Sequence, residues 1–113
     1  MATPAQILKF VDDSKPNTFS EDTKLIWLNE IESRIHCEIY KHREEYMDIS
    51  PDEIDTRDLT AKPPHTAVYW SWLYAMIDFA AEDYDKYQND MQIFNTFWNA
   101  YAKHCIRKRG ENL

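Results

Sequence analysis

A single glycine, Gly110, stands near the end of this 113-residue chain, and this scarcity limits the folds and sites open to it. Phosphate-binding loops, dinucleotide-binding turns, glycine-rich kinase loops and nucleophile elbows each need glycine where the backbone turns. The sequence therefore excludes these sites. It also has no Asn-Gly or Asp-Gly pair for a β-hairpin, and only two valines for strands. These features predict an all-α protein.

Charge and hydropathy argue against nucleic acid and membranes as partners. Thirteen Lys and Arg residues against 20 Asp and Glu give a net charge of −7, which opposes non-specific binding to nucleic acid or an anionic membrane. The longest apolar stretch, Ala67 to Ala81, is shorter than the roughly 20 residues that span a bilayer, so we expect no membrane partner. The first ten residues lack the pattern of a signal peptide. We expect a cytosolic protein with Cys37 and Cys105 as buried, reduced thiols.

Capping residues and helical periodicity predict one domain, residues 1–113, built from about four helices. Thr3, Pro4 and Gln6 have the spacing of a capping box with proline in the first turn, and Ser20 is a favourable N-cap. Apolar residues then recur at steps of three and four. The expected helices run from about Thr3 to Asp13, from Ser20 through Ile39, from about His65 to Ala80, and from about Glu82 to Lys108, with Asn89–Asp90 as a candidate break.

The apolar stripes of these helices predict the core. The third helix is apolar around most of its circumference, which is typical of a helix at the centre of a domain or assembly. We expect eight residues to be largely buried, and three or more mostly exposed ones among them would contradict the assigned helix faces: Leu28, Ile31, Ile35, Trp72, Met76, Phe79, Phe94 and Trp98.

Two charged segments lie outside the apolar stripes. From Glu44 to Lys62 a long acidic loop of about 19 residues holds seven acids against Arg57 before Lys62, whereas the stretch from Lys103 to Arg109 carries four formal positive charges. Both segments have few large apolar residues. We therefore expect neither to be secured in the core of a single subunit, and both to be its most mobile parts.

The sequence offers weak signals for metal or catalytic chemistry. Cysteine and histidine occur without a zinc-ligand spacing, and no nucleophile stands beside a recognisable base, so we expect no catalytic residue, no metal and no cofactor. The alternative is an all-α, Mg²⁺-dependent nucleoside-triphosphate pyrophosphohydrolase, in which carboxylates from facing helices hold the ion. Its ligands would come from Glu44, Glu45, Asp48, Glu82 and Asp85, the last two being spaced to share one helical face.

Three stretches resemble the small helical head–tail connector, or head-completion adaptor, proteins of tailed phages and prophages. The resemblance covers about residues 15 to 105, and it departs from the family at Ala80-Ala81, where relatives often have Asn-Gly. The matching stretches are Lys15-Pro16-Asn17-Thr18-Phe19, the tryptophan–leucine helix from Trp27 to Ile35, and the run from Ala75 to Met91 with Phe94-Asn95, which contains an E-x-Y-D-x-Y-like turn.

The resemblance implies a structural adaptor rather than an enzyme. Such proteins form a ring, usually twelve-fold, between the portal protein and a tail-completion protein, and DNA passes through the lumen only as cargo. The expected location is the virion head–tail junction, with assembly in the cytoplasm of the bacterial host. A lumen lined with carboxylates would repel phosphate and let DNA slide.

Opposite charges on one subunit suggest how copies meet. A heterologous, head-to-tail contact closes a ring when its rotation closes, so we expect the acidic loop of one copy to meet the basic end of the next. Charge would steer the subunits and apolar helix faces would hold them. The candidate partner-contact residues are Glu44, Glu45, Asp48, Asp52, Asp55, Lys103, Arg107, Lys108 and Arg109.

Overall fold

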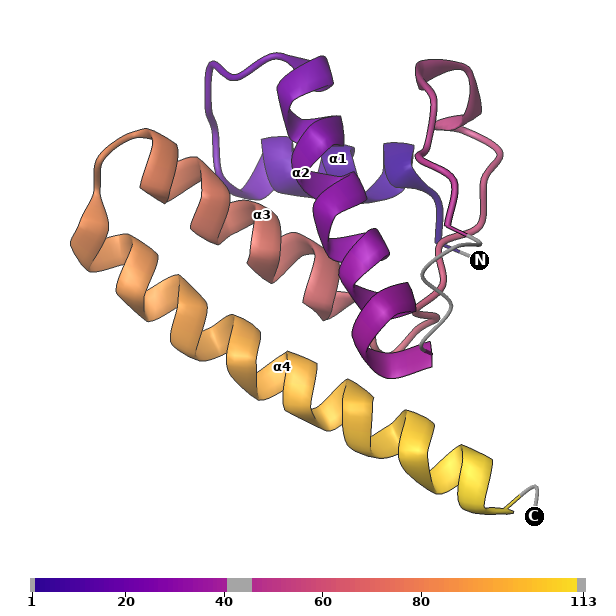
Figure 1. Cartoon of the computed structure of the whole chain (residues 1–113). Coiled ribbons are helices and arrows are strands. Elements are labelled where there is room, and N and C mark those ends of the chain that lie inside the picture. The colour runs from indigo at the N-terminus through magenta and orange to yellow at the C-terminus, as the bar shows by residue number, and fades with distance from the viewer. Residues whose placement is uncertain (1, 41–45, 112–113) are drawn as a thin grey trace.

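The computed structural model describes residues 2–40 and 46–111, and it confirms the all-α class. Figure 1 shows α3 and α4 as an antiparallel hairpin, with α1 and α2 packed over α3. The described residues contain four α-helices, a π-helical turn, a short 3-10 turn and no strand: α1 (Pro4–Ser14), α2 (Glu21–Arg34), η1 (Ile35–Tyr40), η3 (Pro51–Glu53), α3 (Ala67–Ala80) and α4 (Tyr84–Glu111).

The predicted helix starts follow from side-chain caps. The Thr3 hydroxyl accepts from the Gln6 backbone N–H, and the Gln6 side chain accepts from the Thr3 N–H, so the first helix opens with a full capping box. The Ser20 hydroxyl accepts from the Thr23 N–H at the start of α2. These caps satisfy backbone donors that a helix N-terminus otherwise leaves unpaired.

Two details of the helices differ from expectation. After Arg34 the second helix widens into the π-helical turn η1 instead of continuing as an α-helix. The candidate break at Asn89–Asp90 is wrong, because α4 passes through it without interruption. Local propensity is a weak guide in a helix held by tertiary contacts along its length.

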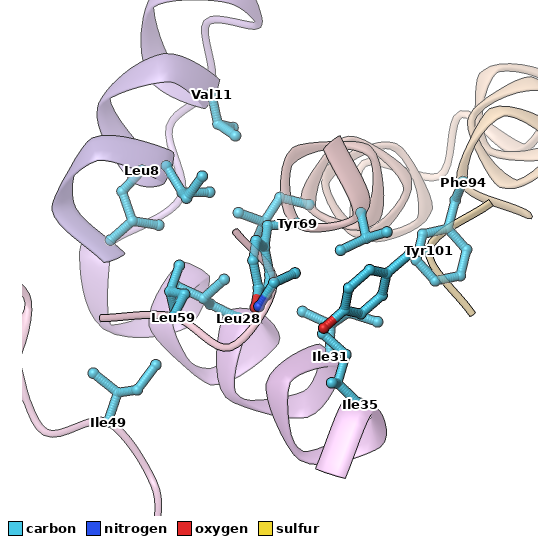
Figure 2. Packing of buried hydrophobic residues seen from close by; sticks show 14 of the residues in the cluster. Leu8, Val11, Leu28, Ile31, Ile35, Ile49, Leu59, Tyr69, Phe94 and Tyr101 are labelled. Atoms are coloured by element: carbon cyan, nitrogen blue, oxygen red, sulfur yellow. The ribbon is translucent and has the colours of Figure 1, made fainter. Parts of the chain in front are cut away.

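Helix α3 occupies the centre of the molecule, which explains why it is apolar nearly all round. It packs against α1, α2 and α4. Figure 2 shows core side chains from all four helices meeting around Tyr69, together with Ile49 and Leu59 from the segment between η1 and α3. A helix with neighbours on three sides has little surface left for charge.

The core prediction holds for most of its eight residues. Leu28, Ile31, Ile35 and Phe94 are fully buried. Trp72, Met76 and Trp98 are half-buried; the Trp72 Nε1–H donates to the Trp27 carbonyl, and the Arg34 guanidinium lies 4.7 Å from the centre of the Trp98 ring. Phe79 is the exception.

Phe79 is 52% exposed, so its predicted burial is wrong. It lies in the last turn of α3, where the chain leaves the bundle, and its ring contacts Tyr84 and Tyr87 across the hairpin turn. The apolar stripe of a helix does not show at which residue its neighbouring helices stop covering it.

The turn between α3 and α4 places Glu82 in the left-handed region, with φ = +62°. The N–H groups of Ala81, Glu82 and Asp83 bond back to the carbonyls of Ile77, Phe79 and Asp78. This left-handed cap usually uses glycine, because a Cβ costs energy there. A glutamate therefore stands where the backbone favours glycine, whereas Ala81, at the position of the relatives' glycine, has a φ of −82°.

Candidate partner-contact surfaces

The segment from 46 to 62 is tied to α2 through Asn29. The Asn29 Oδ1 accepts from the Tyr46 hydroxyl at 2.6 Å and from the Ile49 N–H at 2.7 Å, while its Nδ2 donates to the Ile49 carbonyl at 3.2 Å. One half-buried side chain thus satisfies both backbone groups of Ile49. The Asn29 side chain therefore fixes the backbone of the segment to α2 at Ile49.

A second tie centres on the buried Glu32. Its carboxylate accepts from the Thr60 N–H at 3.0 Å and from the Tyr69 hydroxyl at 2.7 Å. The Tyr69 oxygen in turn accepts from the Ala61 N–H at 2.8 Å. Burial, and then the charge of Glu32, raise the pKa of Tyr69 well above its usual range. Tyr69 is therefore a neutral donor that keeps a buried carboxylate partnered.

Backbone contacts to the N-terminus complete the anchoring. The Ala5 N–H donates to the Ile54 carbonyl and the Leu59 N–H to the Ala2 carbonyl, both at 2.8 Å. Ile49, Leu59 and Ala61 are buried. The prediction that this segment cannot be secured in the core is therefore wrong: three well-placed apolar side chains and a set of satisfied backbone groups replace a large apolar face.

The acids of the segment face outward. Asp48, Asp52 and Asp55 are exposed, as a contact surface requires, whereas Glu44 and Glu45 lie outside the described residues. The cations of the segment are engaged locally, since Arg57 pairs with Glu53 at 3.8 Å and Lys62 pairs with Asp58. Backbone and side-chain hydrogen bonds from Ser50 are the main causes that lower the pKa of Glu53.

Exposed apolar side chains accompany these acids. Met47 is 76% exposed and Ile26 is 59% exposed. Each lines, together with Asp48, a shallow depression on this face; the one beside Ile26 also includes Asn29, Glu30 and Ser33. We use the name acidic face for these exposed residues taken together: Ile26, Met47, Asp48, Asp52 and Asp55.

The end of α4 forms the opposite surface. Lys103, Arg107 and Lys108 are exposed, and none of them forms a salt bridge with any residue that the structure describes. Ile106, between them, is 60% exposed. Figure 1 shows this end of α4 projecting beyond the other helices. We call Lys103, Ile106, Arg107 and Lys108 the basic end; the side chain of Arg109 lies outside the described residues.

A pocket of about 420 Å³ lies on the inner side of the basic end. The His65 and His104 rings meet in its wall with centroids 4.5 Å apart, and burial, then the charge of His104, lower the pKa of His65. The Cys105 Sγ lies 3.4 Å from the Tyr40 hydroxyl. Cys105 is buried as expected, whereas Cys37 is only half-buried.

The geometry does not favour a metal centre. Within the residues that the structure describes, no three His, Cys, Asp or Glu side chains are placed to share an ion. The expectation that Glu82 and Asp85 share one helical face is wrong, because Glu82 lies in the turn before α4 begins. Both side chains are exposed, as is usual for acids at a helix N-terminus.

Sequence reasoning missed a buried charged group between α1, α3 and α4. Asp78 is 5% exposed; its carboxylate lies 2.9 Å from the Lys15 Nζ and contacts the Asp90 carboxyl. The signal was present, since Asp78 is the lone acid in an apolar helix. A charge on a helix that is otherwise apolar all round must find a partner inside the fold.

Comparison of the chain with protein-family models, with curated proteins and with solved structures finds no match in any of the three. Among the helices of the described residues, none joins enough length to enough apolar character to cross a bilayer. The structure shows an all-α bundle, and two of its charged surfaces are the acidic face and the basic end.

Proposed function

We propose that this protein is a structural, non-enzymatic adaptor of a tailed phage or prophage, which forms a ring between the portal and the tail. The observation that carries the proposal is the separation of charge within one subunit. The acidic face and the basic end do not pair with each other in the described residues, so both remain available to a neighbour. The sequence resemblance supplies the biological setting.

The two surfaces suit a head-to-tail contact between copies. Each combines charge with exposed apolar side chains: Ile26 and Met47 with aspartates on one, Ile106 with arginine and lysine on the other. Opposite charge speeds and orients the encounter, while burial of the apolar side chains contributes roughly 25 cal/mol per Å². A contact between different surfaces of identical subunits propagates around a ring until it closes.

The acidic balance of the chain fits a channel for DNA. With a net charge of −7, a ring of copies repels phosphate wherever its carboxylates face the lumen, and so lets DNA pass without sticking. The partners in this proposal are further copies, the portal, a tail-completion protein and DNA as cargo.

The test is assembly on purified portal, followed by electron microscopy. The variant Arg107→Glu/Lys108→Glu should lose ring closure, and adding Asp48→Lys/Asp52→Lys should restore it by reversing both sides of the contact. Lys9→Glu, at an exposed cation of α1 that pairs with Asp13, is the matched control and should assemble normally. Assembly of wild type should weaken as salt shortens the Debye length below ~8 Å. Normal rings from the double variant would contradict the proposal.

The same proposal predicts no hydrolase activity. Incubated with Mg²⁺ or Mn²⁺ and nucleoside triphosphates, the protein should release no pyrophosphate above the blank. Hydrolysis by wild type that is lost in Glu82→Ala and Asp85→Ala would contradict the proposed adaptor and support the pyrophosphohydrolase.

A further inference from the structure

Three charged side chains meet where the end of α1 reaches the α3–α4 hairpin. Lys15 follows α1, Asp78 lies in the last turns of α3, and Asp90 lies in the second turn of α4. The Lys15 Nζ is 2.9 Å from the Asp78 Oδ2. The Asp78 side chain is 7% exposed and that of Lys15 is 23% exposed, so the pair is largely withdrawn from water.

The Asp90 carboxyl lacks a donor. Its Oδ2 is buried and accepts no hydrogen bond from any donor group that the structure describes, whereas the Asp78 Oδ2 faces the Lys15 ammonium. Two ionised carboxylates only accept hydrogen bonds, so their contact would leave the Asp90 Oδ2 unsatisfied and place like charges together. A single proton held between them removes both costs, because the protonated carboxyl donates to its neighbour.

We propose that Asp90 holds a proton that it donates to Asp78 and that, with Lys15, these residues form a clasp on α3: Lys15 fastens the α1–α2 turn to Asp78, and the contact of Asp90 with Asp78 fastens α4 and loosens when that proton leaves. In the closed state Asp90 donates to Asp78, and Asp78 neutralises Lys15. When the proton dissociates, two negative charges face one positive charge. Asp90, the half-buried member, then turns toward water and releases the second turn of α4 from α3.

The surrounding charges support this assignment. Burial, the hydrogen bond to Asp78 and the charge of Asp78 raise the pKa of Asp90 to about 7; Lys15 acts in the opposite direction and Asp83 in the same direction. Lys86, one turn before Asp90, is engaged with Asp83 at 3.5 Å. On the α1 and α2 side, Asp12 is occupied by Lys24 at 2.5 Å. These neighbours leave Lys15 as the cation that Asp78 meets.

The clasp closes one side of a groove of about 710 Å³ between the two turns of the bundle. Residues 14–19 form one wall, and Ile77, Asp78, Ala81, Asp83 and Lys86 form the other. Since Lys15 and Asp78 belong to opposite walls, their contact sets the width of the groove. Loss of the proton adds a second negative charge beside Lys15, so this contact stays in place while the contact between Asp78 and Asp90 is lost.

The direction of the pH effect follows from proton linkage. The unfolded chain loses the Asp90 proton near pH 4, whereas the folded chain keeps it until about pH 7. Between these values the folded state binds more protons, so stability falls as pH rises and then levels off above about pH 7. This trend is opposite to that of an aspartate whose pKa is lowered by a salt bridge.

The first test is an NMR titration of the aspartate side-chain carboxyl carbons in the intact protein. Asp90 should titrate near pH 7, and in Asp78→Asn its midpoint should fall by about two units, toward the ordinary value near 4. Amides of residues 88–92 should exchange faster above the midpoint. An Asp90 midpoint below about 5 in wild type would overturn the proposal, and this result needs no variant to fold.

The second test compares urea unfolding of wild type with Asp90→Asn, whose amide donates to Asp78 at every pH. The wild-type midpoint should fall by about 0.5 M or more between about pH 5 and pH 7.5, and the Asp90→Asn midpoint should stay level. Asp85→Asn, an exposed acid on the same helix, is the control and should keep the wild-type slope. Equal slopes in all three proteins would overturn the clasp. The outcome is independent of ring assembly.

Discussion

The irregular segment from 46 to 62 and the helical end of α4 have similar compositions, being charged and poor in large apolar residues, yet they are held in different ways. The segment lacks α-helix, but its backbone is bonded to Asn29, Glu32 and Tyr69, and Leu59 is fully buried. The end of α4 is regular, but its Lys103, Arg107 and Lys108 project into solvent.

The difference shows that regular structure and tertiary anchoring are separate properties. A helix satisfies its backbone internally, so α4 can extend past its last core contacts near Cys105 without leaving buried groups unpaired. An irregular segment must find external partners for each buried N–H and C=O. In this protein polar side chains of α2 and α3 supply several of them, so the loop is the more firmly attached of the two regions.

The largest expected effect comes from removing the apolar anchor of the segment. Leu59→Ala should destabilise the protein by about 2–5 kcal/mol, because Leu59 is fully buried and its truncation leaves a cavity. Urea unfolding measures the change. Met47→Ala, in the same segment but 76% exposed, should stay within about 0.5 kcal/mol of wild type. Equal effects of the two variants would contradict the assignment of Leu59 as the apolar anchor of the segment.

Removing the polar anchor should have a smaller effect. Asn29→Ala leaves the Ile49 N–H and the Tyr46 hydroxyl without their acceptor, at a cost of about 2–3 kcal/mol. Asn29→Asp keeps that acceptor but sets a carboxylate oxygen against the Ile49 carbonyl in place of a donor. A smaller loss for Asn29→Asp than for Asn29→Ala in thermal unfolding would show that the acceptor is the larger part of the anchor. If Asn29→Ala were neutral, the segment would be held by its apolar side chains alone.

The hairpin turn, at the other end of α4 from the free basic end, should respond to relief of backbone strain. Glu82→Gly should stabilise the protein by up to about 1 kcal/mol, because glycine adopts the left-handed conformation at little cost. Glu82→Ala removes the same side chain but keeps the Cβ, and it separates the backbone effect from any charge effect. Equal melting temperatures for the glycine and alanine variants would show that this turn stores no strain.

The smallest effect on stability is expected at the basic end itself. Arg107→Ala/Lys108→Ala should change the free energy of unfolding by no more than about 0.5 kcal/mol, since the lost interactions are those of exposed cations with a helix dipole. Chemical denaturation checks this value. A loss above about 2 kcal/mol would mean that these side chains hold the subunit together, contrary to the free surface described above.

Patterns that repeat along the chain were predictable, and contacts that depend on single polar residues were not. The caps at Thr3 and Ser20 and the Arg34–Glu38 pair at 2.7 Å follow from local spacing. Asn29 and Glu32 belong to no periodic pattern, so the sequence did not predict their hydrogen bonds to the segment. Exposure of Asp48, Asp52 and Asp55 was correctly anticipated, but the anchoring beneath them was not.

Native-state hydrogen exchange tests the contrast between the two regions most directly. The amides of Ile49, Thr60 and Ala61 should exchange only with global unfolding, or nearly so, because each is bonded to a side chain rooted in α2 or α3. The amides of Ile106, Arg107 and Lys108 should exchange orders of magnitude faster by fraying of the helix end. Rapid exchange at Ile49, Thr60 and Ala61, with protection at the end of α4, would contradict this account.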